Sequence, residues 1–184
     1  MTNPIKAPTQ MSQENNKLTH SDLVQAAYRW VLKYGSCGCA FKELTAYSEI
    51  ADVIGFGSGE HSVLIEVKVS RSDFICDKKK SFRINPDLGM GKRRFYCCPE
   101  YMIRESELPF GWGLIYVNEH NKPTCVYNPN NQFMQIAPSI ERDKRFTGFI
   151  KNEKAERAIM YSALRRLQLN GSTKTIYNFQ PTPQ

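Results

Sequence analysis

Two apolar runs rich in β-branched residues dominate the first half of the chain, at positions 50–56 and 62–69. Between them lies the short polar segment 57–61, which holds two glycines. Apolar β-branched runs that flank a glycine-containing turn are typical of two antiparallel strands. The sequence therefore predicts a β-hairpin here, around which the other elements are organised.

Charged residues interrupt these apolar runs. Asp52 and Glu66 are equally far from Gly59 along the sequence, so we expect them to be neighbours across the hairpin. Side chains alternate along a strand, which places Glu66 and Lys68 on one face and their valine and isoleucine neighbours on the other. Charge at the rim of a hydrophobic sheet is costly. The pattern therefore favours a functional role for these two carboxylates and one ammonium group.

The same patterning predicts three helices and four more strands. Helices are expected at residues 19–34, 70–82 and 152–168, the first capped by Thr19 or Ser21. Strands are expected at residues 39–44, 94–98, 113–117 and 124–127, and a loop at residues 85–91. Strands separated by helical segments favour an α/β fold with a central mixed β-sheet flanked by helices.

The length of the chain, 184 residues, suits one domain with a substantial core. We expect a disordered segment at residues 1–18, a single domain at 19–170 and a loose tail at 171–184. No apolar run approaches the roughly 20 residues needed to cross a bilayer. Residues 1–17 lack the apolar centre of a secretory signal. The sequence therefore predicts a cytoplasmic protein without a membrane partner.

The formal net charge of +7 is unevenly spread. Residues 71–94 hold eight basic and three acidic side chains, and residues 142–174 hold nine basic and three acidic ones. Much of the remaining acidic charge lies around the predicted hairpin. Basic flanks around an acidic centre suit a nucleic acid whose backbone is bound by Lys and Arg. A solvated basic surface without a ligand is the alternative that charge alone leaves open.

The acidic centre suggests a metal-dependent reaction. Mg²⁺ prefers hard oxygen ligands and keeps several waters, so Asp52, Glu66 and the backbone carbonyl of Val67 would bind Mg²⁺ or Mn²⁺ beside a phosphate. Lys68 would stabilise the developing negative charge and orient or deprotonate a water. Glu43 and Glu49 are either auxiliary carboxylates or surface residues. The predicted chemistry is phosphodiester hydrolysis.

The motif Asp52…Glu66-Val67-Lys68 resembles the active-site motif of the PD-(D/E)xK nuclease superfamily. Over roughly residues 40 to 130 the chain is also similar to MmcB-like DNA-repair proteins, chiefly through the string 66–74 and the segment 94–116. This resemblance implies a restriction-endonuclease-like fold, a magnesium ion at Asp52 and Glu66, and Lys68 beside it. It also implies that Arg71, within the same string, contacts phosphate.

These observations give a set of residues expected to contact nucleic acid. The members are polar or basic and lie shortly after the hairpin: Ser70, Arg71, Lys78, Lys79, Lys80, Lys92 and Arg93. The function expected first is a metal-dependent deoxyribonuclease, acting in DNA repair or carried by a mobile element. Many nucleases of this fold are dimers, so a homodimer is a further expectation.

Two alternatives remain open at this point. In the first alternative, the chain is a binding protein on a nuclease-like scaffold. It binds nucleic acid or another protein without catalysis, as a counter-defence factor does. In the second alternative, the chain is a structural or oligomeric accessory protein, and the proximity of Asp52, Glu66 and Lys68 has no function. The sequence does not distinguish DNA from RNA as the ligand.

Overall fold

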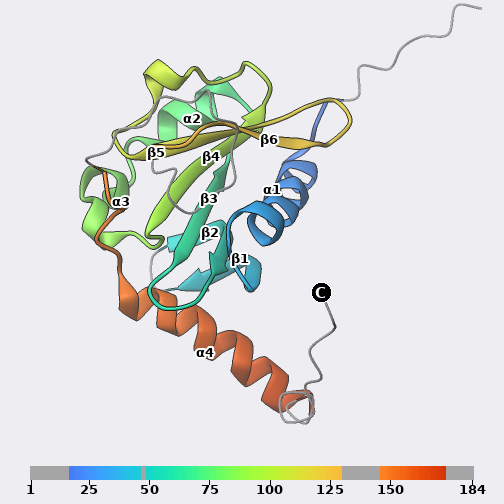
Figure 1. Ribbon diagram of the computed structural model, residues 1–184, viewed down its shortest axis with the longest axis vertical. Helices are drawn as coiled ribbons and strands as arrows, with labels where there is room; N and C mark the ends of the chain where they lie inside the picture. The colour runs from blue at the N-terminus through green and yellow to red at the C-terminus, as the bar shows by residue number, and fades with distance from the viewer. Residues whose placement is uncertain (1–16, 47–48, 130–145, 173–184) are drawn as a thin grey trace, which may run out of the picture.

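The computed structural model describes residues 17–46, 49–129 and 146–172. It contains a six-stranded sheet in the order β1-β2-β3-β4-β5-β6 (Figure 1). The strands are β1 (Cys39–Ala46), β2 (Glu49–Phe56), β3 (Ser62–Val67), β4 (Arg93–Pro99), β5 (Trp112–Val117) and β6 (Pro123–Tyr127). The α-helices are α1 (His20–Tyr34), α2 (Arg71–Asp77), α3 (Ser81–Ile84) and α4 (Glu153–Leu169).

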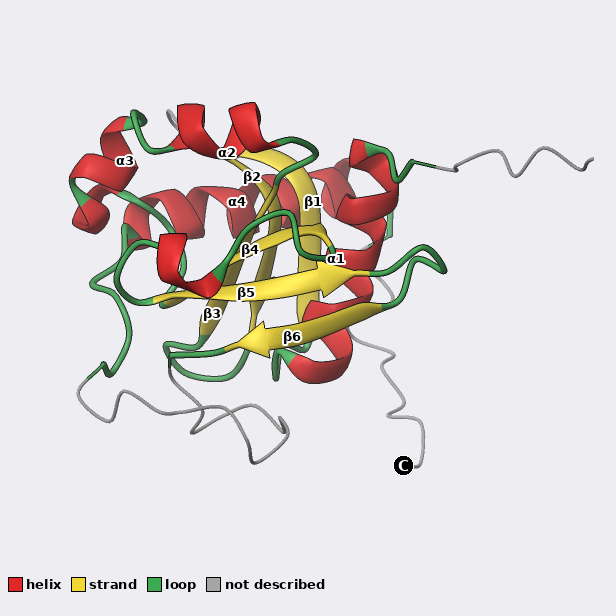
Figure 2. Cartoon of the chain, turned by 90° about the horizontal axis from the view of Figure 1, so that it is seen from above, coloured by secondary structure: helices red, strands yellow, loops and turns green. Residues whose placement is uncertain are grey.

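The sheet is mixed. Strands β1, β2 and β3 are antiparallel neighbours, β3, β4 and β5 are parallel, and β6 returns antiparallel to β5 at the edge. Figure 2 shows that the strand direction turns strongly between β1 and β6, as the usual twist of a sheet requires. The carboxyl ends of the three parallel strands lie at one end of the sheet. The prediction of an α/β fold with a central mixed sheet flanked by helices is confirmed.

Helix α1 covers one face of the sheet. Thr19 caps it, and Thr19 and Asp22 form a reciprocal capping box. Its apolar stripe buries Leu23, Ala27 and Trp30 against the valines and isoleucines of β2 and β3. The ring centroids of Trp30 and Phe95 are 5.2 Å apart. The predicted helix and its Thr19 cap are therefore confirmed, since the apolar spacing and the capping residue act locally.

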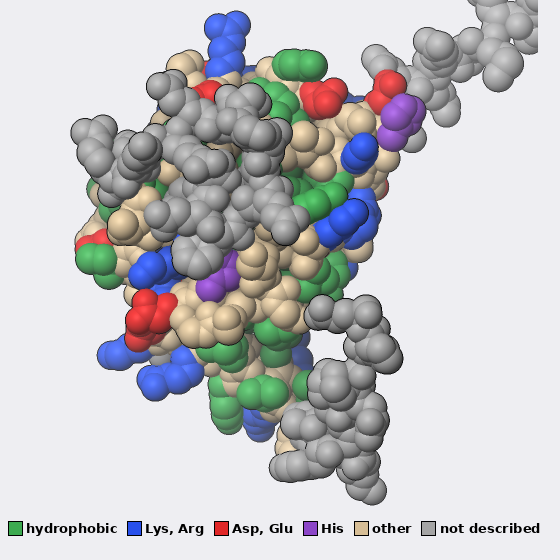
Figure 3. All heavy atoms as spheres, in the orientation of Figure 1, with side chains coloured by type: hydrophobic (Ala, Val, Ile, Leu, Met, Phe, Trp, Pro, Cys, Tyr) green, Lys and Arg blue, Asp and Glu red, His purple; other side chains and the backbone are tan. Residues whose placement is uncertain are grey.

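The opposite face is covered by α2, α3 and the start of α4 (Figure 1). Here Tyr96 stacks on Trp112 at a centroid distance of 4.4 Å and meets the edge of Phe74 at 5.1 Å. Ala155 and Ile159 of α4 are buried in the same cluster. Farther along α4, apolar residues are exposed and line a groove of about 590 Å³ against β1. Figure 3 shows hydrophobic side chains together with Lys and Arg at the lower end of the molecule, where Figure 1 places α4.

Gly113 lies where β5 passes the ring of Phe95. A Cβ at this position would be 2.3 Å from Phe95 ring carbons and 2.9 Å from the carbonyl oxygen of Tyr127. Gly113→Ala is therefore expected to lower the free energy of unfolding by about 1–3 kcal/mol, because the buried ring must move. Urea denaturation of the variant measures this loss.

Gly38→Ala is the matched control for that measurement. Among the described residues, no atom lies within 4 Å of a Cβ built at Gly38. We expect this control to change the free energy of unfolding by less than about 0.5 kcal/mol. Equal effects at Gly38 and Gly113 would contradict the packing of β5 against Phe95.

The predicted hairpin of β2 and β3 is confirmed. Val53 pairs with Ile65 and Phe56 pairs with Ser62, which is the register expected from counting outward from Gly59. The glycine has a φ of 63°, a conformation that favours glycine. The next positions along the two strands are those of Asp52 and Glu66.

The predicted helix at residues 70–82 is wrong in one respect, because it is two helices. Helix α2 begins after its Ser70 cap and ends at Asp77, and α3 begins at Ser81. Between them the amide of Lys80 bonds to the carbonyl of Asp77 in a tight turn. The break turns the side chains of Lys80 and Arg83 toward the sheet, where they meet buried carboxylates. Tertiary ion pairing has overridden the helical pattern.

The remaining expectations concern loops, termini and membranes. The loop at 85–91 includes a short 3-10 helix, Pro86–Leu88, and the strand predicted at 124–127 is the edge strand β6. Residues 1–16 and 173–184 lie outside the described residues, so the predicted disordered segment and tail stay predictions. Within the described ranges, no helix is both long and apolar enough to cross a membrane.

Candidate active site at the carboxyl end of β3

Glu66 and Lys68 point from the end of β3 into the face covered by α2. Both side chains are almost fully buried, with exposed fractions of 2% and 4%. Lys68 Nζ lies 3.4 Å from Glu66 Oε2, and the Lys68 amide donates to the carbonyl of Cys97 on β4 at 2.9 Å. The structure therefore brings together two of the three predicted catalytic groups on one face, as strand alternation requires.

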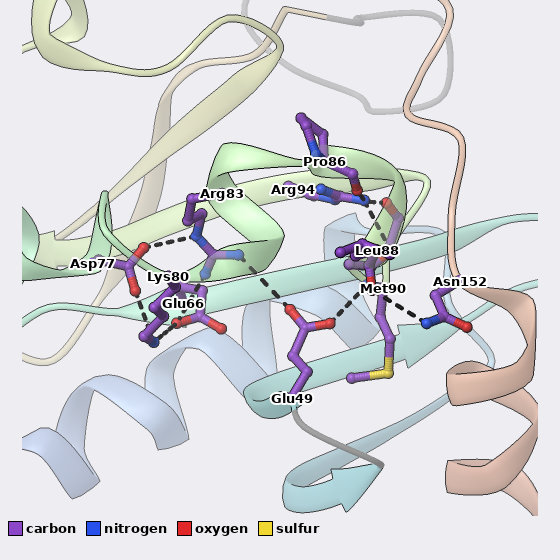
Figure 4. A network of polar contacts seen from close by, with 12 residues as sticks. Glu49, Glu66, Asp77, Lys80, Arg83, Pro86, Leu88, Met90, Arg94 and Asn152 are labelled. Carbon is purple, nitrogen blue, oxygen red and sulfur yellow. Dashed lines mark hydrogen bonds and ion pairs between the residues drawn. The ribbon is translucent and has the colours of Figure 1, made fainter.

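Asp77, at the end of α2, contacts three cations, and Figure 4 shows two of these contacts, with Lys80 and Arg83. Its carboxylate lies 3.2 Å from Lys68 Nζ and 2.7 Å from Lys80 Nζ. It also accepts hydrogen bonds from Arg83 Nε at 2.7 Å and from the Tyr96 hydroxyl at 2.8 Å. Burial raises the pKa of the Asp77 carboxyl, but the positive charges of Arg83 and Lys68 outweigh burial and hold that pKa well below its ordinary value. Asp77 is therefore ionised and fixes the position of Lys68.

Two further cations contact Glu66. Lys80 Nζ lies 3.4 Å and Arg83 Nη2 lies 3.2 Å from the same oxygen, Oε2. The other oxygen, Oε1, is buried and has no hydrogen-bond partner among the described residues. A buried carboxylate oxygen without a partner is costly and calls for an explanation. An incoming cation would find one lone-pair donor ready at this position.

Asp52 approaches the site from β2. Its Oδ2 accepts a hydrogen bond from the Val67 amide at 2.7 Å, and its Oδ1 lies 3.3 Å from His20 Nε2. Burial and the negative charge of Glu66 raise the pKa of Asp52, although the Val67 amide and Lys68 oppose that rise. The side chain is 18% exposed. Asp52 is thus close enough to Glu66 to feel its charge, and it remains reachable from solvent.

The strand pairing is interrupted beside Asp52. The paired positions of β1 and β2 pass from Lys42–Val53 to Leu44–Ala51 and omit Glu43 and Asp52. Glu43 has a φ of 52°, a left-handed conformation that is uncommon for a residue other than glycine and is frequent at functional sites. The local distortion lets Asp52 turn toward the Val67 amide.

The two predicted auxiliary carboxylates differ in their surroundings. Glu43 is 61% exposed and lies 3.9 Å from His20 Nδ1. Glu49 is buried, accepts a hydrogen bond from the Met90 amide at 2.7 Å and lies 3.7 Å from Arg83. Burial raises the pKa of Glu49. Glu49 therefore links the site to the loop at 85–91 (Figure 4), whereas Glu43 belongs to the solvent-exposed side near His20.

The residues predicted to contact nucleic acid are distributed over several environments. Lys78 and Lys79 are exposed in the turn after α2. Lys80 is tied to Asp77 as described above, and Ser70 caps α2. The last member of the group in the sequence, Arg93, has an exposed fraction of only 5%, so it lies within the fold rather than on an open surface.

Arg71 and Lys92 are both paired with acids. Arg71 binds both carboxylate oxygens of Glu107 and also donates to the Met102 carbonyl at 3.0 Å. Lys92 Nζ lies 3.3 Å from Glu60. Both pairs are at least partly exposed, and such pairs are weak enough to exchange with a phosphate. The predicted contacts of these two residues with nucleic acid stay predictions.

The donors at the end of β3 fit a divalent cation in part. Among the described residues, no three His, Cys, Asp or Glu side chains are grouped for metal binding. The predicted site needs only two carboxylates, because Mg²⁺ keeps several waters. Glu66 Oε1 is unpartnered and Asp52 is accessible. Val67 contributes its amide to Asp52, and the predicted role of its carbonyl as a ligand stays untested.

Comparison with known proteins bears on the fold. No family model and no curated protein matches the chain. Among solved structures, the chain is similar to the SPO1766 protein of unknown function from Silicibacter pomeroyi, with a TM-score of 0.54 and 20% sequence identity. The fold is shared with a solved protein. The match covers 86% of this chain and 95% of that one. At this identity the likeness concerns the fold and carries no function.

Sequence reasoning missed four residues of the site, namely His20, Asp77, Arg83 and Tyr96. Asp77 lay within the helix predicted at 70–82, whose apolar side was assigned to other residues, and Arg83 followed the end of that helix. Tyr96 resembled any core aromatic of a strand. The position of His20 could have been predicted, because it is the first residue of a capped helix and such a residue can lie beside the acidic end of a strand.

Proposed function

We propose that this protein is a divalent-metal-dependent nuclease that hydrolyses phosphodiester bonds in DNA, with Asp52, Glu66 and Lys68 as its catalytic groups. One observation carries the proposal. Glu66 is a buried carboxylate with an unpartnered oxygen, beside Lys68 and within the electrostatic reach of Asp52. Buried polar atoms normally have a hydrogen-bond partner, and in the same network Glu49 Oε1 and Asp77 Oδ1 lack one as well. The free oxygen is accounted for if Glu66 is a metal ligand.

The residues of the chain have separate roles in this proposal. A bound Mg²⁺ or Mn²⁺ would polarise the scissile phosphate and lower the pKa of a bound water. The Val67 amide orients Asp52, and Asp77 orients Lys68 through a 3.2 Å ion pair. Lys68 places a positive charge where the pentavalent phosphate gains negative charge, and low local dielectric strengthens this effect. The active-site motif resemblance to PD-(D/E)xK nucleases supports the same assignment of roles.

A second function is favoured by a different observation. Lys80 and Arg83 already contact Glu66 Oε2, at 3.4 and 3.2 Å, and together with Lys68 they neutralise the acidic centre without a metal. A protein that had lost nuclease activity would retain these ion pairs because they stabilise the fold. In this alternative the protein binds nucleic acid through its basic residues and does not cut it.

Metal binding distinguishes the two functions. Isothermal titration with Mn²⁺ is expected to show one site in the wild-type chain, and Asp52→Asn is expected to weaken it about tenfold or more, because a ligand charge is lost. Burial and Glu66 raise the pKa of Asp52, so Mn²⁺ affinity is expected to fall as the pH drops through a value above the ordinary value of about 4. Glu119→Gln, at an 84% exposed side chain, is the control.

The nuclease proposal also requires turnover. Labelled single-stranded and double-stranded DNA incubated with Mg²⁺ are expected to be cut by the wild type, and chelation with EDTA is expected to stop cleavage. Mn²⁺ binding that is equal in the wild type and Asp52→Asn would reject the assigned ligands. DNA binding without cleavage under Mg²⁺ or Mn²⁺ would favour the second function.

A further inference from the structure

A cavity of about 540 Å³ is formed by residues that follow β3 and β4 in the chain. It is lined by Arg71, Tyr101, Met102, Arg104, Ser106 and Glu107. Its volume is in the range of sites for small ligands, such as one nucleotide. Arg71, in the wall of the cavity, follows Lys68 of the candidate active site by three residues, and its guanidinium donates to the Met102 carbonyl. Arg71 follows β3 and Tyr101 follows β4, and these parallel strands end at the same end of the sheet.

Tyr101 forms an aromatic wall of this cavity. Its exposed fraction is 83%, although its ring rests 5.7 Å from the ring of Tyr116. Its φ is 61°, a left-handed conformation that costs free energy for a tyrosine and that clusters at ligand-binding positions. The Tyr101 ring contacts Tyr116 and still leaves most of its surface open to solvent. It is suited to stacking against a flat partner.

Two guanidinium groups and one carboxylate complete the lining. The Arg71 guanidinium binds Glu107 with one bond of 2.7 Å, and the hydrogen bonds from Arg71 and from the Arg104 amide lower the pKa of Glu107 to about 2. Arg104 adds a second, exposed positive charge. The cavity is therefore net positive, and Arg71 binds the Glu107 carboxylate in the bidentate geometry that a guanidinium also uses for phosphate, so a phosphate would replace that carboxylate.

We infer that this cavity binds one nucleotide of a single-stranded nucleic acid, with the base stacked on Tyr101 and its phosphate bound by Arg71 and Arg104. The inference deepens the proposed nuclease function and rests on it for the position of the cleaved bond. Three residues span at most about 10 Å, so the cavity would hold the nucleotide next to the linkage at Lys68. A base in a duplex is stacked on its neighbours, and only an unpaired base offers its face to a side chain.

Binding in the absence of metal tests the inference separately from cleavage. Fluorescence anisotropy in EDTA with a short fluorescein-labelled oligothymidylate is expected to show salt-sensitive binding by the wild type. Tyr101→Ala is expected to weaken binding about tenfold, within the range measured for loss of one base–aromatic stack, and Tyr101→Phe is expected to retain it. Tyr161→Ala, which removes an exposed tyrosine on α4, is the matched control. A hairpin duplex of equal length is the competing ligand.

The outcomes separate the inference from the proposed function. Equal affinity of the wild type and Tyr101→Ala would overturn the inference, even if the protein cuts DNA. Tighter binding of the duplex than of the single strand would overturn it as well. Loss of affinity in Tyr101→Ala and not in Tyr161→Ala supports the cavity as a nucleotide site. That result stands if no divalent metal produces cleavage, in which case the nuclease proposal alone fails.

Discussion

Asp77→Ala is expected to lower the free energy of unfolding by about 3–5 kcal/mol. The side chain is fully buried and contacts three cations, of which Lys68 and Arg83 are themselves 3–4% exposed. Removing the carboxylate leaves Lys68 and Arg83 with Glu66 as their nearest carboxylate and with longer contacts to Asp73 and Glu49. It also removes the acceptor of the Tyr96 hydroxyl. Chemical denaturation monitored by tryptophan fluorescence measures the loss.

The pH dependence of stability tests the role of Asp77 independently. The pKa of Asp77 is lowered in the folded protein, so the unfolded chain binds its proton more readily than the folded one does. The stabilisation is therefore fully present above the ordinary pKa of about 4 and is lost as the pH falls from there toward the lowered value. The acid-induced loss of stability is expected to be smaller in Asp77→Ala than in the wild type.

Asp73→Ala is the control for Asp77→Ala. Asp73 lies on the same helix, is 41% exposed and approaches Lys68 only to 3.9 Å. We expect its removal to cost no more than about 1 kcal/mol. If Asp73→Ala and Asp77→Ala destabilised the protein equally, the network would not be centred on Asp77.

Lys68→Met is expected to slow DNA cleavage by a factor of about 10²–10⁴, with a smaller effect on folding than Asp77→Ala. The buried carboxylates Glu66 and Asp77 keep Lys80 and Arg83 as partners when Lys68 is lost, so their charges remain compensated. The lost ammonium group is the one proposed to stabilise negative charge at the phosphate. Single-turnover cleavage at saturating Mg²⁺ measures the chemical step.

Lys79→Met is the matched control for Lys68→Met. Lys79 is exposed in the turn after α2, and its loss removes the same charge from the protein without entering the site. We expect cleavage within about threefold of the wild type when DNA is saturating, with weaker binding at higher salt. Undiminished cleavage by a folded Lys68→Met protein would remove Lys68 from the mechanism.

The elements of the fold that depend on local patterns were predictable. The hairpin register followed from a symmetric count around Gly59, and α1 followed from its apolar spacing and the Thr19 cap. Neighbouring residues determine such features, so a single sequence contains the information. The mixed sheet followed in turn from the order of strands and helical segments.

The composition of the site was only partly predictable. Glu66 and Lys68 share a face because strands alternate, and this rule is local. Two further features bring other residues to the site. They are the break between α2 and α3 and the parallel pairing of β3 with β4, which place Asp77, Arg83 and Tyr96 together. These are contacts between distant segments, and no periodicity in the chain encodes them.

The turn between α2 and α3 is expected to become less stable when a ligand binds at the candidate active site. Lys80 and Arg83 contact Glu66 on β3 and Asp77 at the end of α2. Any ligand that takes up the charge of Glu66 weakens two of these attachments at once. Backbone amides in residues 78–84 would then exchange with deuterium faster. Their exchange rates would therefore indicate whether a ligand is bound to Glu66.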